Sequence, residues 1–389
     1  MTDLVITFTT LFPSAAKPQH GLFVQDRMQR VVSAGGFDWC VVSPVPRVPF
    51  GLRRGEHRVH ATMPPHEVVG GVEVAHPRYL HVPGLSLRQQ ATRMARGALA
   101  TVQQLAAGRR AVLDAHYVYP DGIAALHVAN ALDLPCVVTA RGTDLNVIGR
   151  REGVARQIRA LAPRARGLFA VSEELARAFA TISGLPPPRV QLARNGVDPA
   201  RFPLGDRARA RQVLGLPARP PLLLGAGRLV RSKGFHLAVQ ALSRLPGVGL
   251  VLAGDGEERE RLRAQGGDDL HLLGSLPPAG MALAYQAADV LELPSAREGW
   301  PNVVTEALAA GLPVVAHAVG AVPQILADAR YGAAVAPGDE AAFVAAIRRF
   351  LADPPPRTTV RGFAQRFAWD ETVTLLVDRF RAILGEARR

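Results

Sequence analysis

Residues 290–311 read VLELPSAREGWPNVVTEALAAG, and this stretch decides the fold class. It opens with a short apolar run, Val290 to Leu293, that is typical of a buried strand. A loop and then a helix-compatible segment follow, with Pro301 in its first turn and Gly311 past its end. A strand that leads into a helix in this way is half of a βαβ unit, so the stretch predicts a parallel sheet.

The same alternation of short apolar runs and longer helix-compatible segments recurs along the whole chain. We therefore expect an α/β fold in two similar domains that face each other across a hinge, with a cleft at the carboxyl ends of their strands. The best candidate for the hinge is the polar stretch from Asn195 to Pro221, which is rich in Pro and Gly. The expected strands are Leu4 to Thr9, Trp39 to Ser43, Ala111 to Ala115, Pro135 to Thr139, Leu168 to Val171, Val190 to Ala193, Pro221 to Gly225, Gly249 to Ala253, Leu270 to Leu273, Val290 to Leu293, Pro313 to Ala316 and Gly332 to Val335.

The chain is basic. Its 389 residues include 46 Lys and Arg against 33 Asp and Glu, a net charge of +13 that favours an anionic partner. Lysine occurs only at Lys17 and Lys233, so nearly all the basic residues are arginine, and we interpret part of the charge as compositional bias. A nucleic-acid-binding protein is the alternative that the charge alone permits. No zinc-finger spacing, RNP-type aromatic motif or basic stripe supports it, so we expect no nucleic-acid partner.

Composition also bears on the compartment. Cys40 and Cys136 are the only cysteines, and both lie in apolar runs, which excludes a disulfide framework. The first residues lack the basic start and cleavage site of a signal peptide, and no apolar stretch approaches the roughly 18 to 20 residues of a membrane span. We therefore expect a cytoplasmic protein.

The loop and helix of the opening stretch hold candidate ligand-binding residues. Backbone N–H groups near Asn302 and Val303, at the start of the helix, suit an anion such as a diphosphate. Glu298 before the helix and Glu306 within it are close enough to reach one bound molecule. Because like charges repel, carboxylates beside a phosphate site suit the paired hydroxyl groups of a sugar or ribose. The alternative is that both acids are ordinary solvated residues, but the surrounding Gly-Trp-Pro-Asn sequence favours a site.

A glycine-rich turn, Gly225 to Gly234, follows another expected strand. Such a turn brings the backbone close to a ligand, and the cations Arg228 and Lys233 can neutralise the two phosphates of a leaving nucleoside diphosphate. Lys233 indicates a need for a compact ammonium group, because this chain uses arginine almost everywhere else. The alternative is a surface turn with solvated charges. The pattern matches neither the P-loop nor the dinucleotide fingerprint.

In the first half, polar residues follow two expected strands. His116 follows the run that begins at Ala111, and Arg141 and Asp144 follow the run that begins at Pro135, so titratable groups are expected at the edge of the cleft. A histidine such as His116 is, taken alone, more often structural than functional. No His or Cys cluster, Asp-x-Asp pattern or G-x-S-x-G elbow is present, so neither metal-dependent nor serine-hydrolase chemistry is indicated.

Five motifs, in order, resemble those of the retaining GT-B glycosyltransferases of family 4, and the likeness runs from Phe12 to about Trp369. The motifs are Val171 to Glu173, Arg194 to Asp198, Gly225 to Gly234, Glu298 to Glu306 and Gly311 to Val315. The resemblance implies two Rossmann-like domains, with residues 1–198 on the acceptor side and residues 199–369 binding the nucleotide sugar. It also implies a terminal helix within residues 370–389 that packs back on the first domain.

The resemblance further implies a metal-independent reaction with a nucleoside-diphosphate sugar as donor and no cofactor. It places Arg228 and Lys233 on the diphosphate, Glu306 on the ribose hydroxyls and Glu298 on hydroxyls of the donor sugar. The residues expected to be catalytic are Arg228, Lys233, Glu298 and His116. Those expected to bind the donor are Glu306, Gly227, Gly21, Asn302, Val303, Arg141, Asp144 and Gly299. Segments near Gly254 to Gly256 and Gly274 to Leu276 are expected beside the base.

Three positions depart from the family pattern. Arg141-Gly142 stands where the family often has His-Gly, and the single Gly21 stands where it has a Gly-Gly loop. The third departure is the sequence from Gly320 to Gln324, where the family has Gly-Gly-x-Pro-Glu.

These observations predict transfer of a sugar, with retention of configuration, to a saccharide, lipid-linked or small-molecule acceptor. Such a reaction belongs to cell-surface polysaccharide or glycoconjugate synthesis. A nucleotide-sugar epimerase on a similar fold and a non-catalytic relative of the family are the alternatives.

A basic segment of the first domain bears on the acceptor. Residues 47–110 contain ten arginines and three acids, and a helix that begins near Leu87 has one apolar face. Such a helix can lie on an anionic membrane surface, at the inner face of the membrane, which would suit a lipid-linked acceptor. The alternative is a helix whose apolar face joins the core. The arginines are Arg47, Arg53, Arg54, Arg58, Arg78, Arg88, Arg93, Arg96, Arg109 and Arg110.

Overall fold

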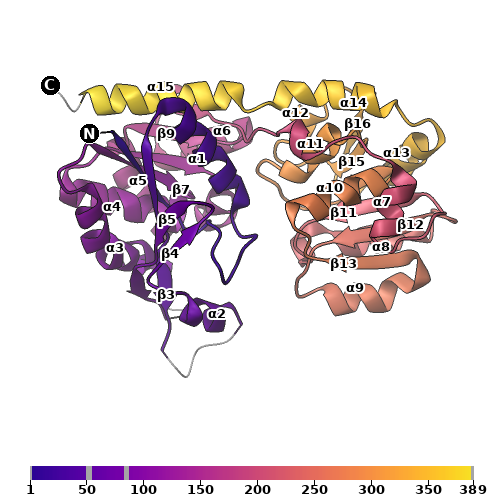
Figure 1. Ribbon diagram of the computed structural model, residues 1–389, viewed down its shortest axis with the longest axis horizontal. Helices are drawn as coiled ribbons and strands as arrows, with labels where there is room; N and C mark the ends of the chain where they lie inside the picture. The colour runs from indigo at the N-terminus through magenta and orange to yellow at the C-terminus, as the bar shows by residue number, and fades with distance from the viewer. Residues whose placement is uncertain (1, 50–54, 83–86, 387–389) are drawn as a thin grey trace. The chain divides into compact units, whose positions relative to one another are not determined.

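The computed structural model describes residues 2–49, 55–82 and 87–386. The chain forms two compact units, here called unit 1 (Met1–Asn195 with Asp370–Arg389) and unit 2 (Gly196–Trp369), each with its own sheet (Figure 1). The chain first passes from unit 1 to unit 2 between Asn195 and Gly196, a few residues before the domain boundary predicted after Asp198. The stretch predicted as a hinge also contains a helix, α7 (Arg207–Val213), that packs within unit 2.

Unit 1 is built on an eight-stranded sheet. Its strands are β1 (Leu4–Phe8), β2 (Asp38–Val42), β4 (His66–Val69), β5 (Val72–Ala75), β7 (Ala111–His116), β8 (Cys136–Ala140), β9 (Gly167–Ala170) and β10 (Val190–Leu192). Their order across the sheet is β10-β9-β8-β7-β1-β2-β5-β4, and every neighbouring pair is parallel except β4 with β5. The apolar runs expected in this half all form strands, which confirms the α/β prediction.

Strands β4 and β5 do not follow from the apolar runs. They form an antiparallel hairpin around Gly70 and Gly71, whose φ angles of 59° and 82° suit glycine in a tight turn. This edge of the sheet is therefore mixed, where the sequence predicts a parallel sheet. Two further short strands, β3 (Val45–Arg47) and β6 (Arg78–Leu80), pair with each other in a separate parallel ribbon.

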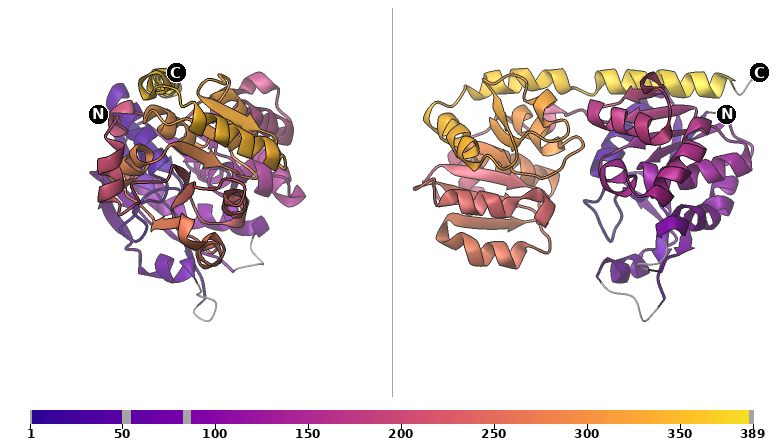
Figure 2. Two further views of the ribbon diagram at one scale, coloured as in Figure 1. Left: turned by 90° about the vertical axis from the view of Figure 1, so that its right-hand side faces the viewer. Right: turned by 180° about the vertical axis from the view of Figure 1, so that it is seen from behind.

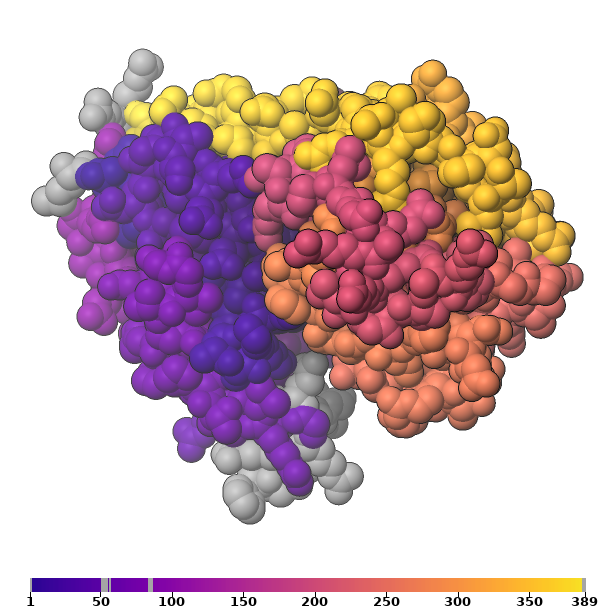
Figure 3. Space-filling model, turned by 45° about the vertical axis from the view of Figure 1, so that its right-hand side comes forward, coloured from indigo at the N-terminus to yellow at the C-terminus, as the bar shows by residue number. Residues whose placement is uncertain are grey.

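The terminal helix belongs to unit 1. Helix α15 (Asp370–Glu386) packs against α1 (Leu22–Gly35), as the views from both sides show (Figures 1 and 2). In the space-filling view the yellow surface of α15 lies against the violet surface of unit 1 (Figure 3). Its Leu376, Phe380 and Leu384 share one buried cluster with Val24 and Met28 of α1. The helices of unit 1 are α1 (Leu22–Gly35), α2 (Glu56–Thr62), α3 (Gln90–Ala106), α4 (Ile123–Leu132), α5 (Glu152–Leu161), α6 (Glu173–Ser183) and α15 (Asp370–Glu386).

Helix α3 is the basic amphipathic helix of the sequence analysis. Its apolar face, including Ala91, Met94, Ala98 and Val102, is buried, and the helix packs against α4 and β6. The alternative interpretation, a core-facing helix, is therefore correct, and this face is not available to a membrane. Arg53 and Arg54 of the basic segment lie outside the described residues. No described helix has both the length and the apolar character of a membrane span.

Unit 2 is built on a six-stranded sheet in which every neighbouring pair is parallel. Its strands are β11 (Leu222–Ala226), β12 (Gly249–Ala253), β13 (Leu270–Gly274), β14 (Val290–Leu293), β15 (Val314–His317) and β16 (Gly332–Val335). Its helices are α7, α8 (Phe235–Leu242), α9 (Arg259–Gly266), α10 (Pro278–Ala287), α11 (Asn302–Ala309), α12 (Val322–Ile325), α13 (Glu340–Ala352) and α14 (Arg357–Ala364). The strand order is β13-β12-β11-β14-β15-β16, and all six strands follow the predicted apolar runs.

Each sheet contains one point where the strand order reverses. In unit 1 the chain builds outward from β1 through β2, and then returns to the other side of β1 with β7. In unit 2 it builds from β11 to β13 and returns beside β11 with β14. At such a point the connections after the two adjacent strands leave toward opposite sides, which opens a crevice at the carboxyl ends. The loops after β1, β7, β11 and β14 are therefore the structural candidates for ligand binding.

The interior of unit 2 contains an acid without a partner. Glu292 on β14 is fully buried, and neither of its carboxyl oxygens has a hydrogen-bond partner among the described residues. A Cβ atom placed on Gly225 would lie 2.7 Å from Glu292 Oε1 and 2.7 Å from a ring carbon of Phe235, so the carboxyl group lies in apolar packing. Burial raises the pKa of Glu292 well above its usual range, because the ionised form is the one that burial disfavours.

We predict that Glu292→Gln removes a pH-dependent loss of stability. The unfolded chain ionises this acid near pH 4.3 and the folded chain ionises it only at higher pH, so unfolding is increasingly favoured as the pH rises above that value. The gap in free energy of unfolding between variant and wild type should grow by up to about 1.4 kcal/mol per pH unit until the folded-state pKa is reached. Denaturant titrations at pH 4.5, 6 and 7.5 measure this gap. The exposed Glu257→Gln is the control, and a gap for Glu292→Gln that is constant with pH would contradict the assignment.

Candidate active site

In unit 2 the loops after β11 and β14 meet at the reversal point. Ala296 N donates a hydrogen bond to Ser232 O at 2.9 Å. Gly234 adopts a φ of 74°, and a Cβ atom there would overlap Pro294 O, so only glycine allows the two loops to approach this closely. The glycine-rich turn and the Glu298 loop therefore form one surface at the carboxyl edge of the sheet.

Two of the predicted catalytic side chains contact each other across this junction. Lys233 Nζ lies 2.7 Å from Glu298 Oε1, and the two side chains are 25% and 9% exposed. Arg228, on the same turn as Lys233, is exposed. The sequence analysis assigns Lys233 to a diphosphate and Glu298 to sugar hydroxyls. The structure pairs these two side chains with each other.

The turn after β11 is fixed against the turn after β12. Gly227 has a φ of 142°, and a Cβ atom on Gly254 would overlap Gly227 O. Leu229 N donates to Asp255 O at 2.9 Å, and Gly254 N donates to Gly274 O at 2.7 Å. The segments expected beside a base thus border the glycine-rich turn, and their geometry is set by backbone contacts that leave no room for side chains.

Helix α11 begins at Asn302, with Pro301 as the residue before it. Asn302 and Val303 are partly exposed in its first turn, as predicted for an anion-binding helix start. Glu306 lies in the second turn and accepts a hydrogen bond from the fully buried Tyr285 hydroxyl at 2.7 Å. The sequence offers no signal for Tyr285, which lies on α10 and orients one oxygen of Glu306.

The loop that carries Glu298 also contacts the third departure from the family pattern. Ala321 N donates to Gly299 O at 3.1 Å. Gly320 has a φ of 57°, and a Cβ atom there would overlap Glu298 O. Backbone packing thus requires glycine at position 320. Gly299 takes part in the same junction through its carbonyl oxygen, which accepts from Ala321 N.

In unit 1 the loops after β1 and β7 meet in the same manner. Thr10 donates to Asp121 Oδ2 through its backbone N at 2.5 Å and through Oγ1 at 2.8 Å. Burial raises the pKa of Asp121 to about 7, although these hydrogen bonds lower it and so oppose the shift. Gly21, with a φ of 75°, precedes α1, and a Cβ atom there would overlap Leu11. The loop after β1 is thus packed tightly at Gly21 and held to the loop after β7.

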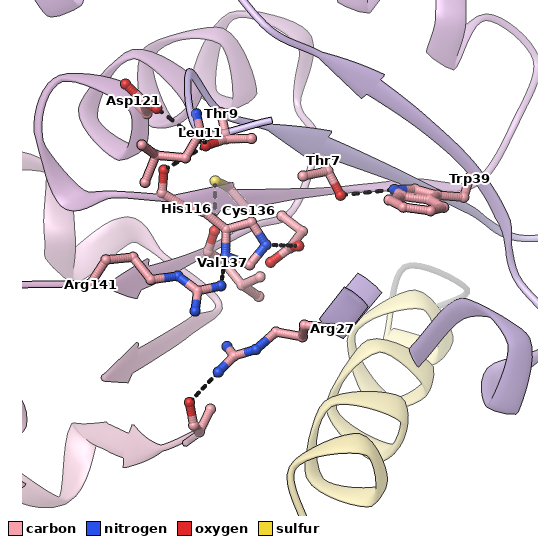
Figure 4. A network of polar contacts seen from close by, with 12 residues as sticks. Thr7, Thr9, Leu11, Arg27, Trp39, His116, Asp121, Cys136, Val137 and Arg141 are labelled. Atoms are coloured by element: carbon pink, nitrogen blue, oxygen red, sulfur yellow. Dashed lines mark hydrogen bonds and ion pairs between the residues drawn. The ribbon is translucent and has the colours of Figure 1, made fainter. Parts of the chain in front are cut away.

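His116, the last residue of β7, is fully buried and both of its ring nitrogens are occupied (Figure 4). Arg141 Nη2 lies 2.6 Å from Nδ1, and Asp114 Oδ2 lies 2.8 Å from Nε2. A guanidinium group can only donate, so Nδ1 accepts and the ring proton is on Nε2, facing Asp114. Burial, opposed by Asp114, lowers the pKa of His116 to about 4. In this arrangement His116 is neutral and contacts Nη2 of Arg141, and the catalytic role predicted for it stays a prediction.

Asp144 is occupied by the backbone around it. Its carboxylate accepts from the N–H groups of Val118 at 2.7 Å, Gly142 at 2.6 Å and Arg141 at 3.1 Å. Burial raises its pKa, and these bonds oppose that shift. Asp144 therefore fixes the turn from which Arg141 extends, and the donor contact predicted for it stays a prediction.

Arg27 and Asn195 complete the cluster, and the sequence analysis assigns neither of them a role. Arg27 on α1 donates through Nη2 to Ala193 O and, at 3.0 Å, to Asn195 Oδ1. Arg141 Nη1 donates to the same oxygen at 2.7 Å. Residues 27 and 195 are far apart in the sequence, so only the fold brings them together.

Within residues 2–49, 55–82 and 87–386, no three His, Cys, Asp or Glu side chains are placed to share a metal ion.

The two halves of the chain match two family models. Residues 206–367 match the model described as glycosyl transferases group 1, and residues 50–201 match that of glycosyltransferase family 4. Among curated relatives, TuaC of Bacillus subtilis, named for glycosyl transfer in teichuronic acid biosynthesis, is 31% identical over 331 residues, 82% of each chain. The D-inositol 3-phosphate glycosyltransferase of Acidothermus cellulolyticus is 37% identical over 235 residues, which is 55% of this chain and 52% of the relative.

Solved structures support the fold. Sucrose-phosphate synthase from Thermosynechococcus elongatus superposes with a TM-score of 0.79 at 22% identity, covering 99% of this chain and 100% of the other. Anabaena HepE in complex with UDP superposes with a TM-score of 0.72 at 19% identity, covering 98% and 100%. The GT-B arrangement of two Rossmann-like domains is therefore confirmed as the fold class.

We predict that Asp144→Asn lowers the free energy of unfolding by about 1 to 3 kcal/mol, because the amide turns an N–H group toward backbone donors that need an acceptor. The matched control is Asp133→Asn at an exposed left-handed position, where asparagine is well tolerated and the change should be within about 0.5 kcal/mol. Denaturant unfolding compares the two. Equal effects would show that the three backbone contacts of Asp144 contribute nothing to stability.

Proposed function

The chain belongs to the group 1 glycosyltransferases, and from that premise we propose that it moves a sugar from a nucleoside-diphosphate sugar to a saccharide, lipid-linked or small-molecule acceptor. Its homologues act in glycosyl transfer, and the relative TuaC is named for a cell-wall polymer, which supports a role in polysaccharide or glycoconjugate synthesis. We further propose UDP as the nucleotide of the donor, because one of the similar structures, HepE, was solved with UDP.

The observation that carries the proposal is the Lys233–Glu298 contact at the reversal point of unit 2. A cation and a hydroxyl-binding carboxylate are held 2.7 Å apart beside the start of α11. A diphosphate bound to Lys233, Arg228 and the helix N–H groups would leave the attached sugar next to Glu298. Glu306, oriented by Tyr285, would accept from the ribose hydroxyls.

We propose that the protein contributes chiefly electrostatic stabilisation. As the bond between the sugar carbon C1 and the diphosphate oxygen breaks, the bonding electrons leave with the diphosphate, and Lys233 and Arg228 stabilise the charge that develops there. The acceptor hydroxyl attacks from the same face and its proton passes to the departing phosphate oxygen. This route conserves configuration, and it requires neither a protein nucleophile nor a metal ion.

The compartment and the membrane belong to the proposal as well. The thiols of Cys40 and Cys136 are buried and unpaired, which fits a reducing compartment, and we propose a cytoplasmic enzyme. Contact with an anionic membrane surface rests on exposed arginines alone, such as Arg47, Arg58 and Arg96, because the apolar face of α3 is buried.

We expect Arg228→Ala and Lys233→Ala each to lower kcat by about 30- to 1000-fold, the effect of losing about 2 to 4 kcal/mol of transition-state stabilisation. Arg231→Ala is the matched control, an exposed cation on the same turn, and its kcat should stay within about threefold of wild type. Release of nucleoside diphosphate from a panel of nucleotide sugars measures the rates. Unchanged rates for Arg228→Ala and Lys233→Ala, or no thermal shift with any nucleotide, would overturn the proposal.

The stereochemical course has its own test. Proton NMR of the product formed in the first minutes should show the donor's anomeric configuration, with the same rate in excess EDTA. Inversion of configuration would exclude the front-side route, and loss of the rate in EDTA that added Mg²⁺ restores would exclude metal independence. Interconversion of the nucleotide sugar without transfer would indicate an epimerase.

A further inference from the structure

Two arginines in unit 1 converge on neutral groups. Arg27 and Arg141 donate to the same oxygen, Asn195 Oδ1, at 3.0 and 2.7 Å. Their other acceptors are Ala193 O for Arg27 and His116 Nδ1 for Arg141. Figure 4 shows the two guanidinium groups extending toward this region from different elements, α1 and the segment after β8.

This arrangement leaves buried donors without acceptors. Arg27 is fully buried, and among the described residues its Nε and Nη1 atoms have no hydrogen-bond partner. The Nε atom of Arg141 is likewise buried without a partner. Each guanidinium group carries five N–H donors, whereas the cluster offers two neutral oxygens and one ring nitrogen.

The nearby acids do not pair directly with these cations. Asp114 contacts His116, which lies between it and Arg141. The carboxylate of Asp144 is held by backbone N–H groups. Burial lowers the pKa of Arg27 to about 10, and burial together with the charge of Arg27 lowers that of Arg141 well below its usual range. The charges of Asp114 and Asp144 oppose these shifts, but His116 and backbone N–H groups hold the two carboxylates, so the cluster lacks an anionic acceptor for its buried donors.

The cluster lies where an open α/β sheet binds ligands. His116 ends β7, Arg141 follows β8 and Asn195 follows β10, so all three are at the carboxyl edge of unit 1. Arg141 is only partly buried, and its Cζ atom lies 5.2 Å from the ring centre of Phe23. The ring restrains the guanidinium plane, as expected for a group that binds a planar or tetrahedral oxyanion in a fixed direction.

We propose that Arg141, supported by Arg27, binds an oxyanion carried by one of the two substrates, a carboxylate or phosphate group on a sugar. The inference rests on the proposed glycosyl transfer and narrows its substrate to an acidic sugar. It assigns the anion to residues of unit 1, whereas the residues proposed for the diphosphate belong to unit 2. His116 is a positioning residue here, because it holds Nη2 of Arg141 and leaves the rest of the fork to the ligand.

A substitution at Asn195 distinguishes an oxyanion-binding cluster from one that serves stability alone. Asn195→Asp would place a carboxylate between the two guanidinium groups and supply the missing charge from within the protein. The variant should therefore be more stable than wild type and at the same time bind the oxyanion less tightly. Arg141→Gln should also lose oxyanion binding, and the exposed Arg177→Gln of α6 is the control for removal of one positive charge from unit 1.

The experiment measures binding to the full chain by calorimetry. For the donor, the affinity for UDP-glucuronate is compared with that for UDP-glucose. For the acceptor, the affinity for a glucuronate-containing oligosaccharide is compared with that for its neutral counterpart, and both of these titrations contain saturating UDP. We expect the acidic member of one pair to bind about ten- to a hundredfold more tightly to wild type and to Arg177→Gln. That preference should be lost in Arg141→Gln and Asn195→Asp, while UDP alone binds wild type and Arg177→Gln equally.

The pair that shows the preference identifies which substrate carries the anion. Equal binding of acidic and neutral members, or a preference that survives in both variants, overturns the inference while leaving the proposed glycosyl transfer intact. Failure of UDP and of both UDP-sugars to bind wild type would instead overturn UDP as the nucleotide, and failure of every nucleoside diphosphate to bind would overturn the proposed function. In that case phosphate and glucuronate alone still test the cluster, since thermal stabilisation of wild type but not of Arg141→Gln supports it and no stabilisation overturns it.

Discussion

The reversal of strand order within each sheet is the constraint on which the candidate sites depend. It forces the chain to leave two neighbouring strands in opposite directions, β1 and β7 in unit 1 and β11 and β14 in unit 2. Loops that are distant in sequence are thereby brought into contact at one edge. The Lys233–Glu298 contact and the hydrogen bonds between Thr10 and Asp121 are both results of that topology. Glycines 234, 254 and 320 then allow the backbones to approach more closely than any side chain would permit.

The cations at the carboxyl edges of the two sheets have different kinds of partner. In unit 2 the ammonium group of Lys233 is paired with the carboxylate of Glu298, so an anion bound as proposed would exchange with that carboxylate. In unit 1 the guanidinium groups of Arg27 and Arg141 share an amide oxygen, and no such exchange is needed. A self-paired lysine is easily displaced, because its point charge has no fixed direction. An arginine fork held by His116 and Asn195 selects a ligand by geometry.

Prediction from sequence succeeded where the signal was local. Every strand predicted from an apolar run is present, and the loop between Val290 and Asn302 has the predicted strand–loop–helix form. The β4–β5 hairpin shows a local signal that the strand prediction did not use, the Gly70–Gly71 pair between alternating residues. Other features have no local signal. The contact between Arg27 and Asn195 depends on α1 packing beneath the carboxyl edge of the sheet, and the roles of His116 and Asp144 follow from burial, which their spacing in the sequence does not reveal.

The return of α15 to unit 1 also determines the order in which the protein is completed during synthesis. The ribosome releases residues 1–195 first, but one side of their core, around Val24 and Met28 of α1, is closed only by Leu376, Phe380 and Leu384. Unit 2 is contiguous in sequence and has all its strands before α15 emerges. The part of the chain made first is thus the part finished last, and a nascent chain that stalls before residue 370 exposes an apolar surface that chaperones can recognise.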